Sequence, residues 1–194
     1  GILSNTNTLS LSDASSALKL AGTNTISGPV SLNAGLIDVD ESATLSADLS
    51  LGGSAEIDVA SGRTLSYGGA AIELGANTLT VSGAGILSNT NALTLGDDSS
   101  TLKLTGTNTI SGPVSLNAGL IDVDESSALR AALSLGGSAE IDVASGKTLS
   151  YRGAALALGA NTLTLSGAGI LSNTNALTLD NASSALKVGG TNTI

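Results

Sequence analysis

The chain has no cysteine, histidine, methionine, tryptophan or phenylalanine, and its aromatic residues are two tyrosines. The lack of histidine and cysteine excludes His-based catalytic triads, thiol nucleophiles and ordinary zinc sites. No GxxxxGK[ST] loop occurs, so the usual phosphate-binding loop is missing as well. No apolar run approaches the roughly eighteen residues that a membrane-spanning helix needs. Composition alone thus removes several large classes of enzyme and predicts no membrane insertion.

Basic residues are also scarce, with seven Lys and Arg against sixteen Asp and Glu and a net charge of −9. Phosphate backbones and anionic lipid surfaces are bound by clustered Lys and Arg. We therefore expect no nucleic-acid partner. The simplest role of an acidic surface with few charges is to keep the protein soluble.

What the chain does contain is alternation, seen best in residues 44–63, where three short apolar/polar runs are separated by small-residue corners. Successive side chains of a strand point to opposite faces, so each run has one apolar face. The predicted inward side chains are Leu45, Leu49, Leu51, Ile57 and Val59, followed by Leu65 in the next run, and the outward ones are Ser46, Ser50, Glu56 and Asp58. Three strands and three corners make one triangular coil. A coil of about twenty residues buries little alone and must stack on copies of itself.

Those copies are present, because the segment 1–7 recurs at 85–91 and at 169–175, a period of 84 residues. Four coils of about 21 residues fit each period, giving repeats 1–84 and 85–168 and a partial repeat 169–194. We predict a single all-β domain, a parallel β-helix (β-solenoid) of about nine coils and about 43 Å. Parallel crossovers favour right-handed coiling. No leader segment and no polar cap is visible, so we expect an excerpt of a longer array whose partners are further repeats or other copies, end to end.

The same pattern predicts which residues stack. In the first column Thr25, Thr44 and Thr64 are expected above one another, with Ile26, Leu45 and Leu65 behind them. The outward rank of the third column is expected to run through Lys19, Asp38, Asp58, Thr80, Lys103, Asp122, Asp142, Thr164 and Lys187. Lys19 then offsets the repulsion between stacked aspartates. Tyr67 and Tyr151 are expected to cover a corner.

Carboxylates are the remaining candidates for chemistry. Asp38, Asp40, Glu41 and Asp58 are candidate calcium ligands through their oxygens, and with Glu56 they form an acidic strip that recurs in the second repeat. The catalytic alternative is that two of these carboxylates act as general acid and general base on a polysaccharide. The corners are short and the aromatics few, so a solvated face is the favoured interpretation, with no catalytic residue and no cofactor. A threonine face that orders ice is a further alternative, weakened by Arg130 in its plane.

The two full repeats differ mainly at outward or corner positions. Ser46 corresponds to Arg130, Asp48 to Ala132, Gly68 to Arg152 and Glu73 to Ala157. Core differences are conservative, Ile72 to Leu156 and Val81 to Leu165. This distribution of differences between the repeats supports the assignment of inward and outward side chains.

Recurring phrases such as Thr64-Leu65-Ser66, Ile57-Asp58-Val59 and Asn33-Ala34-Gly35 resemble the passenger regions of large bacterial exoproteins. Filamentous-haemagglutinin-like adhesins and autotransporters are the nearest examples of that family. The resemblance implies a secreted, extracellular β-helix at the cell surface. The close regularity of the 84-residue repeat favours a structural role, as a filament, sheath or stalk segment, over ligand recognition. An adhesin that binds host or glycan ligands outside this segment is the main alternative.

Overall fold

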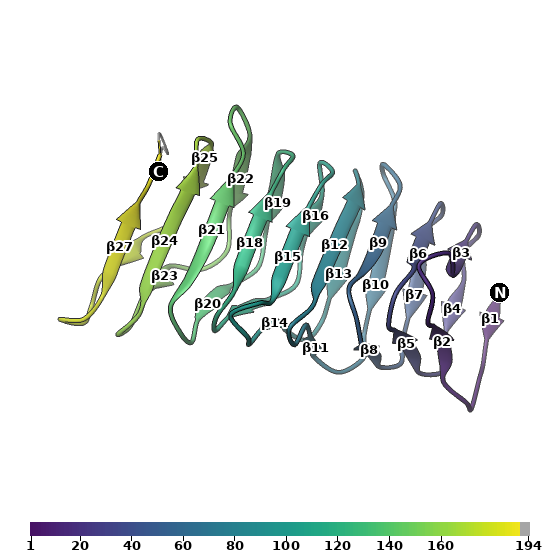
Figure 1. Cartoon of the computed structure of the whole chain (residues 1–194). Helices are drawn as coiled ribbons and strands as arrows, with labels where there is room; N and C mark the ends of the chain where they lie inside the picture. Colours follow the sequence, from purple (N-terminus) through teal and green to yellow (C-terminus); the bar gives the residue numbers. More distant parts are fainter. Residues whose placement is uncertain (191–194) are drawn as a thin grey trace.

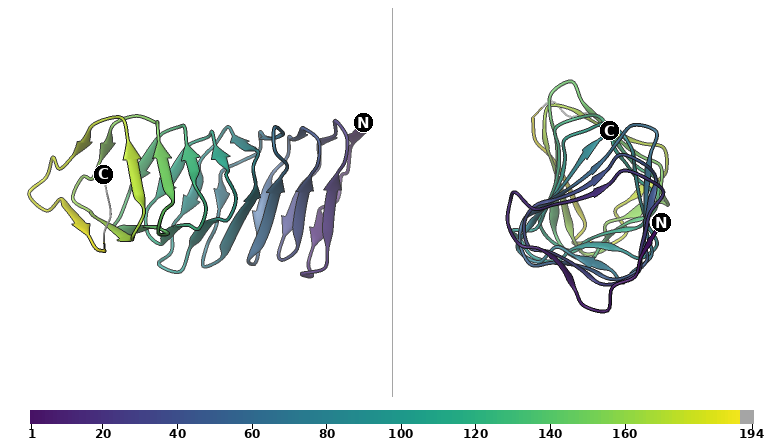
Figure 2. Two further views of the ribbon diagram at one scale, coloured as in Figure 1. Left: turned by 90° about the horizontal axis from the view of Figure 1, so that it is seen from above. Right: turned by 90° about the vertical axis from the view of Figure 1, so that its right-hand side faces the viewer.

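The chain folds as a stack of coils, each made of three short strands. The computed structural model describes residues 1–190, in which 27 strands and no helix occur. Every strand pairs in parallel with the equivalent strand of a neighbouring coil, as from β1 to β4 and from β3 to β6. Figure 1 shows the strands side by side along one axis, and the end-on view of Figure 2 shows a three-sided outline. The predicted parallel β-solenoid of about nine coils is confirmed, whereas its handedness stays a prediction.

Three columns of strands run along the axis, and we call them the first, second and third sheets. The first and third are continuous nine-stranded sheets, whereas the second is divided into parts of three, four and two hydrogen-bonded strands. The first contains β1 (Ile2–Leu3), β4 (Thr25–Ile26), β7 (Ala43–Leu45), β10 (Thr64–Tyr67), β13 (Ile86–Asn89), β16 (Thr109–Ile110), β19 (Ser127–Leu129), β22 (Thr148–Tyr151) and β25 (Ile170–Asn173). The second contains β2 (Leu9–Leu11), β5 (Val30–Leu32), β8 (Leu49–Leu51), β11 (Ile72–Glu73), β14 (Leu93–Leu95), β17 (Val114–Leu116), β20 (Leu133–Leu135), β23 (Leu156–Ala157) and β26 (Leu177–Thr178). The third contains β3 (Ala17–Leu20), β6 (Leu36–Val39), β9 (Ala55–Val59), β12 (Thr78–Gly83), β15 (Thr101–Leu104), β18 (Leu120–Val123), β21 (Ala139–Val143), β24 (Thr162–Gly167) and β27 (Ala185–Val188).

The inward side chains of all three sheets form one apolar core along the axis. Leu45, Ile57, Val59 and Leu65 are at most 2% exposed, as predicted. Leu51 is instead only half-buried at the rim of this core. The reason is local, because β8 has no hydrogen-bonded strand on its far side.

Glycine allows the tight corners that join the strands. Gly35 has φ +85°, and an added Cβ would lie 2.4 Å from the carbonyl oxygen of Ser16 in the coil below. Among the described residues all left-handed positions are glycines. The corner asparagines contribute through their amides instead, as where Asn77 Nδ2 donates to the Leu74 carbonyl at 2.9 Å.

The stack is not uniform, because the fourth coil is offset from the third by two residues. In the first sheet Thr44 lies opposite Ser66, and Leu45 lies opposite Tyr67. The predicted stacking of Thr64 on Thr44 is therefore wrong, although Thr25 does stack on Thr44. A two-residue shift keeps inward residues inward, whereas a one-residue shift would turn every side chain to the other face.

The third sheet shows the same offset, and the second sheet is interrupted at the same step. In the third sheet Asp58 lies opposite Ser82, and Thr80 lies opposite Glu56. In the second sheet the ladder stops between β8 and β11, and again between β20 and β23. The offset recurs four coils later, where Leu129 lies opposite Tyr151. It is thus a periodic feature of the 84-residue repeat.

Tyrosine fills the place where the second-sheet ladder is broken. At neighbouring steps the first N–H of the strand donates to a carbonyl of the next coil, as from Leu9 to Pro29 and from Val30 to Asp48, both at 2.9 Å. At the offset the Leu49 N–H donates instead to the Tyr67 hydroxyl at 3.0 Å. Tyr67 is 2% exposed, and burial raises its pKa. The expectation that the tyrosines cover a corner is wrong, because they belong to the core.

The second repeat contains the same substitution of a hydroxyl for a carbonyl. The Leu133 N–H donates to the Tyr151 hydroxyl at 3.1 Å, and that hydroxyl donates to the Ala154 carbonyl at 2.7 Å. The period of two could have revealed this role, since Tyr67 follows Leu65 by two residues and so points to the same side.

Removing the Tyr67 hydroxyl should leave the Leu49 N–H buried without an acceptor. We expect Tyr67→Phe to destabilise the protein by about 1–3 kcal/mol, the cost of an unsatisfied buried donor. Urea unfolding measures the loss, and hydrogen exchange should show faster exchange at the Leu49 amide. Leu65→Ile changes the shape of the core without touching this hydrogen bond, and it serves as the control. An unchanged Leu49 amide in Tyr67→Phe would contradict the role of the hydroxyl.

The difference in burial between Ile57 and Leu51 gives a second prediction. Ile57 is fully buried, so Ile57→Ala should cost about 2–5 kcal/mol. Leu51→Ala should cost clearly less, because its side chain is already partly in contact with solvent. Equal shifts of the two unfolding midpoints would show that Leu51 is a core residue after all.

Candidate functional site

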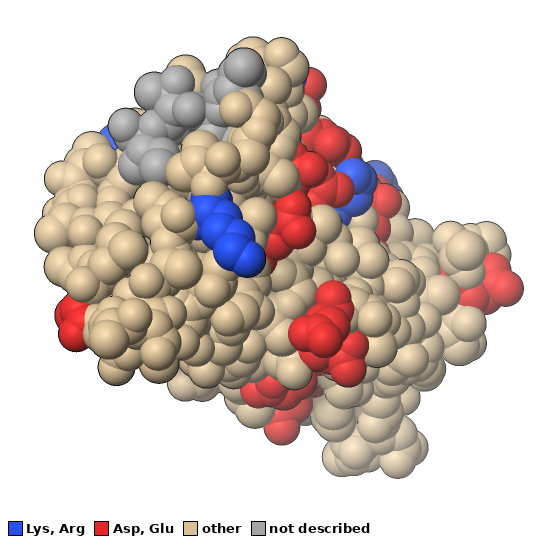
Figure 3. Space-filling model, turned by 60° about the vertical axis from the view of Figure 1, so that its left-hand side comes forward, with Lys and Arg blue, Asp and Glu red and all other residues tan. Residues whose placement is uncertain are grey.

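The acidic strip lies on the outer face of the third sheet and the corner that follows it. Asp38 in β6 and Asp58 in β9 are stacked directly, and Lys19 in β3 lies one coil below Asp38. Asp40 and Glu41 follow β6 at the corner. Figure 3 shows that acidic side chains gather in separate groups over a largely uncharged surface, with basic side chains beside some of them.

Lys19 holds two of these carboxylates. Its Nζ lies 2.7 Å from Asp38 Oδ2 and 2.7 Å from Asp40 Oδ2. Hydrogen bonds to the two carboxylates raise the pKa of Lys19, Asp38 being the larger cause. The second repeat reproduces the bridge, since Lys103 lies 2.6 Å from Asp122 and 2.7 Å from Asp124. The predicted contact between Lys19 and Asp38 is confirmed.

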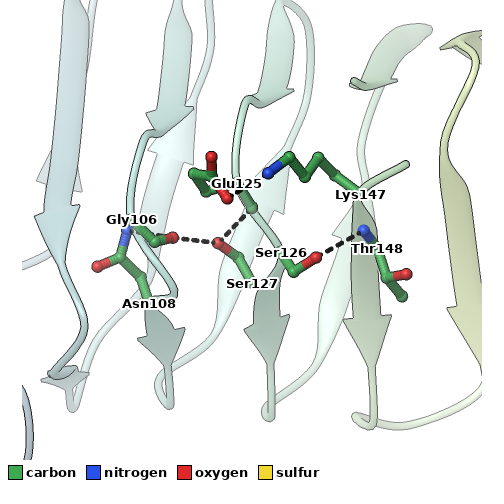
Figure 4. Close-up of polar contacts among 7 residues, drawn as sticks. All are labelled: Gly106, Asn108, Glu125, Ser126, Ser127, Lys147 and Thr148. Carbon is green, nitrogen blue, oxygen red and sulfur yellow. Dashed lines mark hydrogen bonds and ion pairs between the residues drawn. The ribbon is translucent and has the colours of Figure 1, made fainter. Parts of the chain in front are cut away.

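Glu41 has a cation of its own. Arg63, from the corner before β10, lies 2.9 Å from Glu41, and its equivalent Lys147 lies 2.6 Å from Glu125. Figure 4 shows this second pair beside a corner where Ser126 Oγ accepts the Thr148 N–H. These contacts join neighbouring coils at the edge between the third and first sheets.

A second group of bonds in the same corner involves a buried asparagine. Asn108 is 2% exposed, and its Nδ2 donates to the carbonyls of Val81 at 2.6 Å and Gly106 at 3.1 Å. Ser127 Oγ donates to the same Gly106 carbonyl at 2.9 Å (Figure 4). These hydrogen bonds satisfy the backbone carbonyls of Val81 and Gly106 and connect neighbouring coils.

The two-residue offset interrupts the series of outward side chains that was predicted for the third sheet. The rank from Lys19 through Asp38 and Asp58 continues to Ser82, not to Thr80. Lys103 lies opposite Thr80, which in turn lies opposite Glu56. The rank expected from the sequence is therefore wrong at this step and at the equivalent step in the second repeat, where Asp142 lies opposite Ser166 and not Thr164. The other expected steps are correct.

Glu56 and Asp58 have no cationic partner among the ion pairs of residues 1–190. The carboxylate of Glu56 accepts a hydrogen bond from the hydroxyl of Ser82. Burial raises the pKa of Asp58, and the charges of Asp38 and Glu56 raise it further. The pKa of Asp142 is raised by the same kinds of cause. Stacked carboxylates are thus the least favourable charges of the strip.

The calcium candidates do not converge. Asp38 and Asp40 are held by Lys19, and Glu41 is held by Arg63. Within the described part of the chain no three acidic side chains come together in a way that would hold a metal ion. Calcium binding at Asp38, Asp40, Glu41 and Asp58 therefore gains no geometric support.

Two shallow open grooves lie beside the strip, one in each repeat. The first, of about 390 Å³, is lined by Leu36, Ser54, Glu56, Thr78 and Thr80 among others. The second, of about 600 Å³, is lined by equivalent residues, with Asp98 in place of Ala14 and with Thr101 and Lys187 in addition. Hydroxyl and carboxylate groups are prominent in both, and neither has an aromatic wall. The sequence did not reveal these grooves.

The predicted threonine face is also interrupted. The outward column of the first sheet runs from Ile2 through Thr25 and Thr44 to Ser66 and Ser88. Thr64 lies in a different column, opposite Ile86. A regular lattice of threonines, which the ice-binding alternative requires, is therefore not formed by these residues.

Comparisons with protein-family models, with curated proteins and with solved structures gave no match. Residues 1–190 include no helix that is long and apolar enough to cross a membrane.

The raised pKa of Asp58 predicts how stability depends on pH. The folded state binds this proton more tightly than the unfolded state, so the group has no effect well below the unfolded pKa of 3.8. It lowers stability progressively as the pH rises from that value through the higher folded pKa. Asp58→Asn should therefore stabilise the protein at pH 7, by about 0.2–1 kcal/mol for one cross-strand charge pair. The gain should shrink as the pH falls through the folded pKa of Asp58 toward 3.8, and it should be absent well below 3.8.

Thermal unfolding on both sides of this range measures the effect. Asp98→Asn is the matched control, because it removes one exposed carboxylate that has no stacked aspartate. A gain of equal size for both variants would assign the effect to net charge. A loss for Asp58→Asn would contradict the repulsion.

Proposed function

We propose that this chain is a structural segment of an extracellular bacterial filament, sheath or stalk, without catalysis. The observation that carries the proposal is the continuity of the first and third sheets through all nine coils. Each coil adds backbone hydrogen bonds parallel to the axis, and a rod built in this way resists bending and extension. The extracellular location rests on composition and on the resemblance to bacterial exoproteins.

The end coils support association along the axis. Ile2 and Leu3 in the first coil are 77% and 47% exposed, and Leu179 and Val188 in the ninth are 52% and 49% exposed. Their equivalents inside the stack lie against a neighbouring coil. Open strand edges with apolar side chains pair readily with further strands. Further repeats or other copies are the partners that these surfaces fit.

The side faces support a passive role. Most charges of the acidic strip are paired with a cation from a neighbouring coil, and the grooves are shallow and open. The occurrence of one groove in each repeat is the observation that favours the alternative, an adhesin passenger. A hydroxyl-rich glycan is the ligand class that such a lining suits.

Electron cryomicroscopy of native material from the producing cells tests the proposal. We expect continuous unbranched fibres with an axial repeat near ~4.8 Å and, because of the offset every four coils, a second repeat near ~19 Å. Discrete rods that end in a globular head would instead identify the segment as the stalk of an adhesin.

A further inference from the structure

The two repeats differ in charge at one edge of the solenoid, where the chain passes from the first sheet to the second. In the third coil Asp48 lies at this edge, and in the fourth coil Glu73 lies just beyond it on β11; we call these two residues the acidic patch. In the seventh and eighth coils this edge has Arg130 and Arg152, which we call the basic patch. Each patch lacks the charges of the other, because Ala132 and Ala157 replace the acids and Ser46 and Gly68 stand in place of the arginines.

The two arginines are neighbours. Arg130 follows β19 and Arg152 follows β22, and the pairing of Leu129 with Tyr151 puts them on adjacent strands, about 4.8 Å apart. Both are exposed, and neither has an ion-pair partner among the residues described. Like charges in direct cross-strand contact are unfavourable.

The fold does not require this pair. Ser46 and Gly68 occupy the equivalent places, and a Cβ added at Gly68 would meet no atom within 4 Å. The arginines therefore lie on open surface, at a cost to stability that the first repeat avoids. Such a pair is well suited to carboxylates, with which arginine forms paired hydrogen bonds.

The acidic patch has carboxylates of this kind. Asp48 is exposed and uses Oδ1 to accept the Ala70 N–H at 2.8 Å. Glu73 is exposed on the outer face of β11. Neither takes part in the ion pairs that residues 1–190 form, all of which lie on the third sheet and at its exit corner.

The patches lie near the same edge of the solenoid, four coils apart and about 19 Å along the axis. Between them the second sheet presents Thr94, Ser115 and Ser134, which carry no charge that would oppose contact. One chain cannot join its own patches, because the rod is straight between them. Two chains side by side and antiparallel can join both, since the acidic patch of each then faces the basic patch of the other.

We propose that this edge is an interaction surface for a second copy of the chain, in an antiparallel pair related by a two-fold axis. Such a contact is self-complementary and closes at two chains. It lies on the side of the rod and uses none of the end-coil surfaces, so it stands independently of association along the axis.

Sedimentation velocity of the chain in about 20 mM and about 500 mM salt gives the first test. A species of twice the 18.7 kDa chain mass should form in low salt and disappear in high salt, because screening weakens exposed charge contacts. The double variant Arg130→Ser/Arg152→Gly, which introduces the residues of the first repeat, should abolish it. The control Arg63→Ser/Lys147→Ser removes the same charge elsewhere and should keep it.

Charge reversal gives the sharper test of geometry. Asp48→Arg/Glu73→Arg makes both patches basic, and Arg130→Glu/Arg152→Glu makes both acidic. Each variant alone should be monomeric, and an equal mixture should recover a one-to-one pair of twice the chain mass. Circular dichroism shows that each variant remains folded.

Three results would overturn the proposal. They are a monomer at every salt concentration, a pair that Arg130→Ser/Arg152→Gly leaves intact, and alternating chains longer than two in the mixture. Association through the end coils would show none of this dependence on the four charged residues, so the two modes are distinguished by the same measurements.

Discussion

The backbone ladder between coils is the constraint on which the rest of this structure depends. Each strand pairs only with its equivalents above and below, so no coil can move without the two beside it. Because side chains alternate with a period of two, the register between coils can change only in steps of two residues. The molecule uses one such step every four coils. It preserves the apolar core while it divides the second-sheet ladder, and the buried tyrosine hydroxyls replace the missing carbonyl acceptors.

The register also determines the electrostatics. Direct stacking brings Lys19 against Asp38, and the following corner brings Arg63 to Glu41. The same stacking forces Asp58 against Asp38, and burial there raises the pKa of Asp58. Favourable and unfavourable contacts thus have one origin, the spacing of outward positions on adjacent coils. Since exposed ion pairs contribute only about 0–1 kcal/mol, the core and the ladder supply most of the stability.

The internal repeat acts as a comparison within one molecule. Most core residues, corner glycines and ion-paired carboxylates are the same in both repeats. Where charge differs, at Asp48 and Glu73 in the first repeat and at Arg130 and Arg152 in the second, the side chains are exposed and form no ion pair among the described residues. Two repeats with the same fold can acquire different roles at exposed positions that the fold does not constrain.

The sequence by itself determined the coil, the number of strands in it and the direction in which most side chains point, because these follow from a period of two and from corners of small residues. Leu45, Ile57, Val59 and Leu65 were predicted correctly on that basis. The register between coils was decided only by the tertiary structure, since pairing in a parallel stack depends on how the corners of two coils fit together. That is why Thr64 and Thr80 were misplaced, and why neither the grooves nor the dispersal of the calcium candidates could be read from the chain. The inward position of the two tyrosines could have been read from the period of two, since each follows an inward leucine by two residues. The exposed charges of the two patches were visible in the sequence, but their places on one edge, four coils apart, follow from the stack.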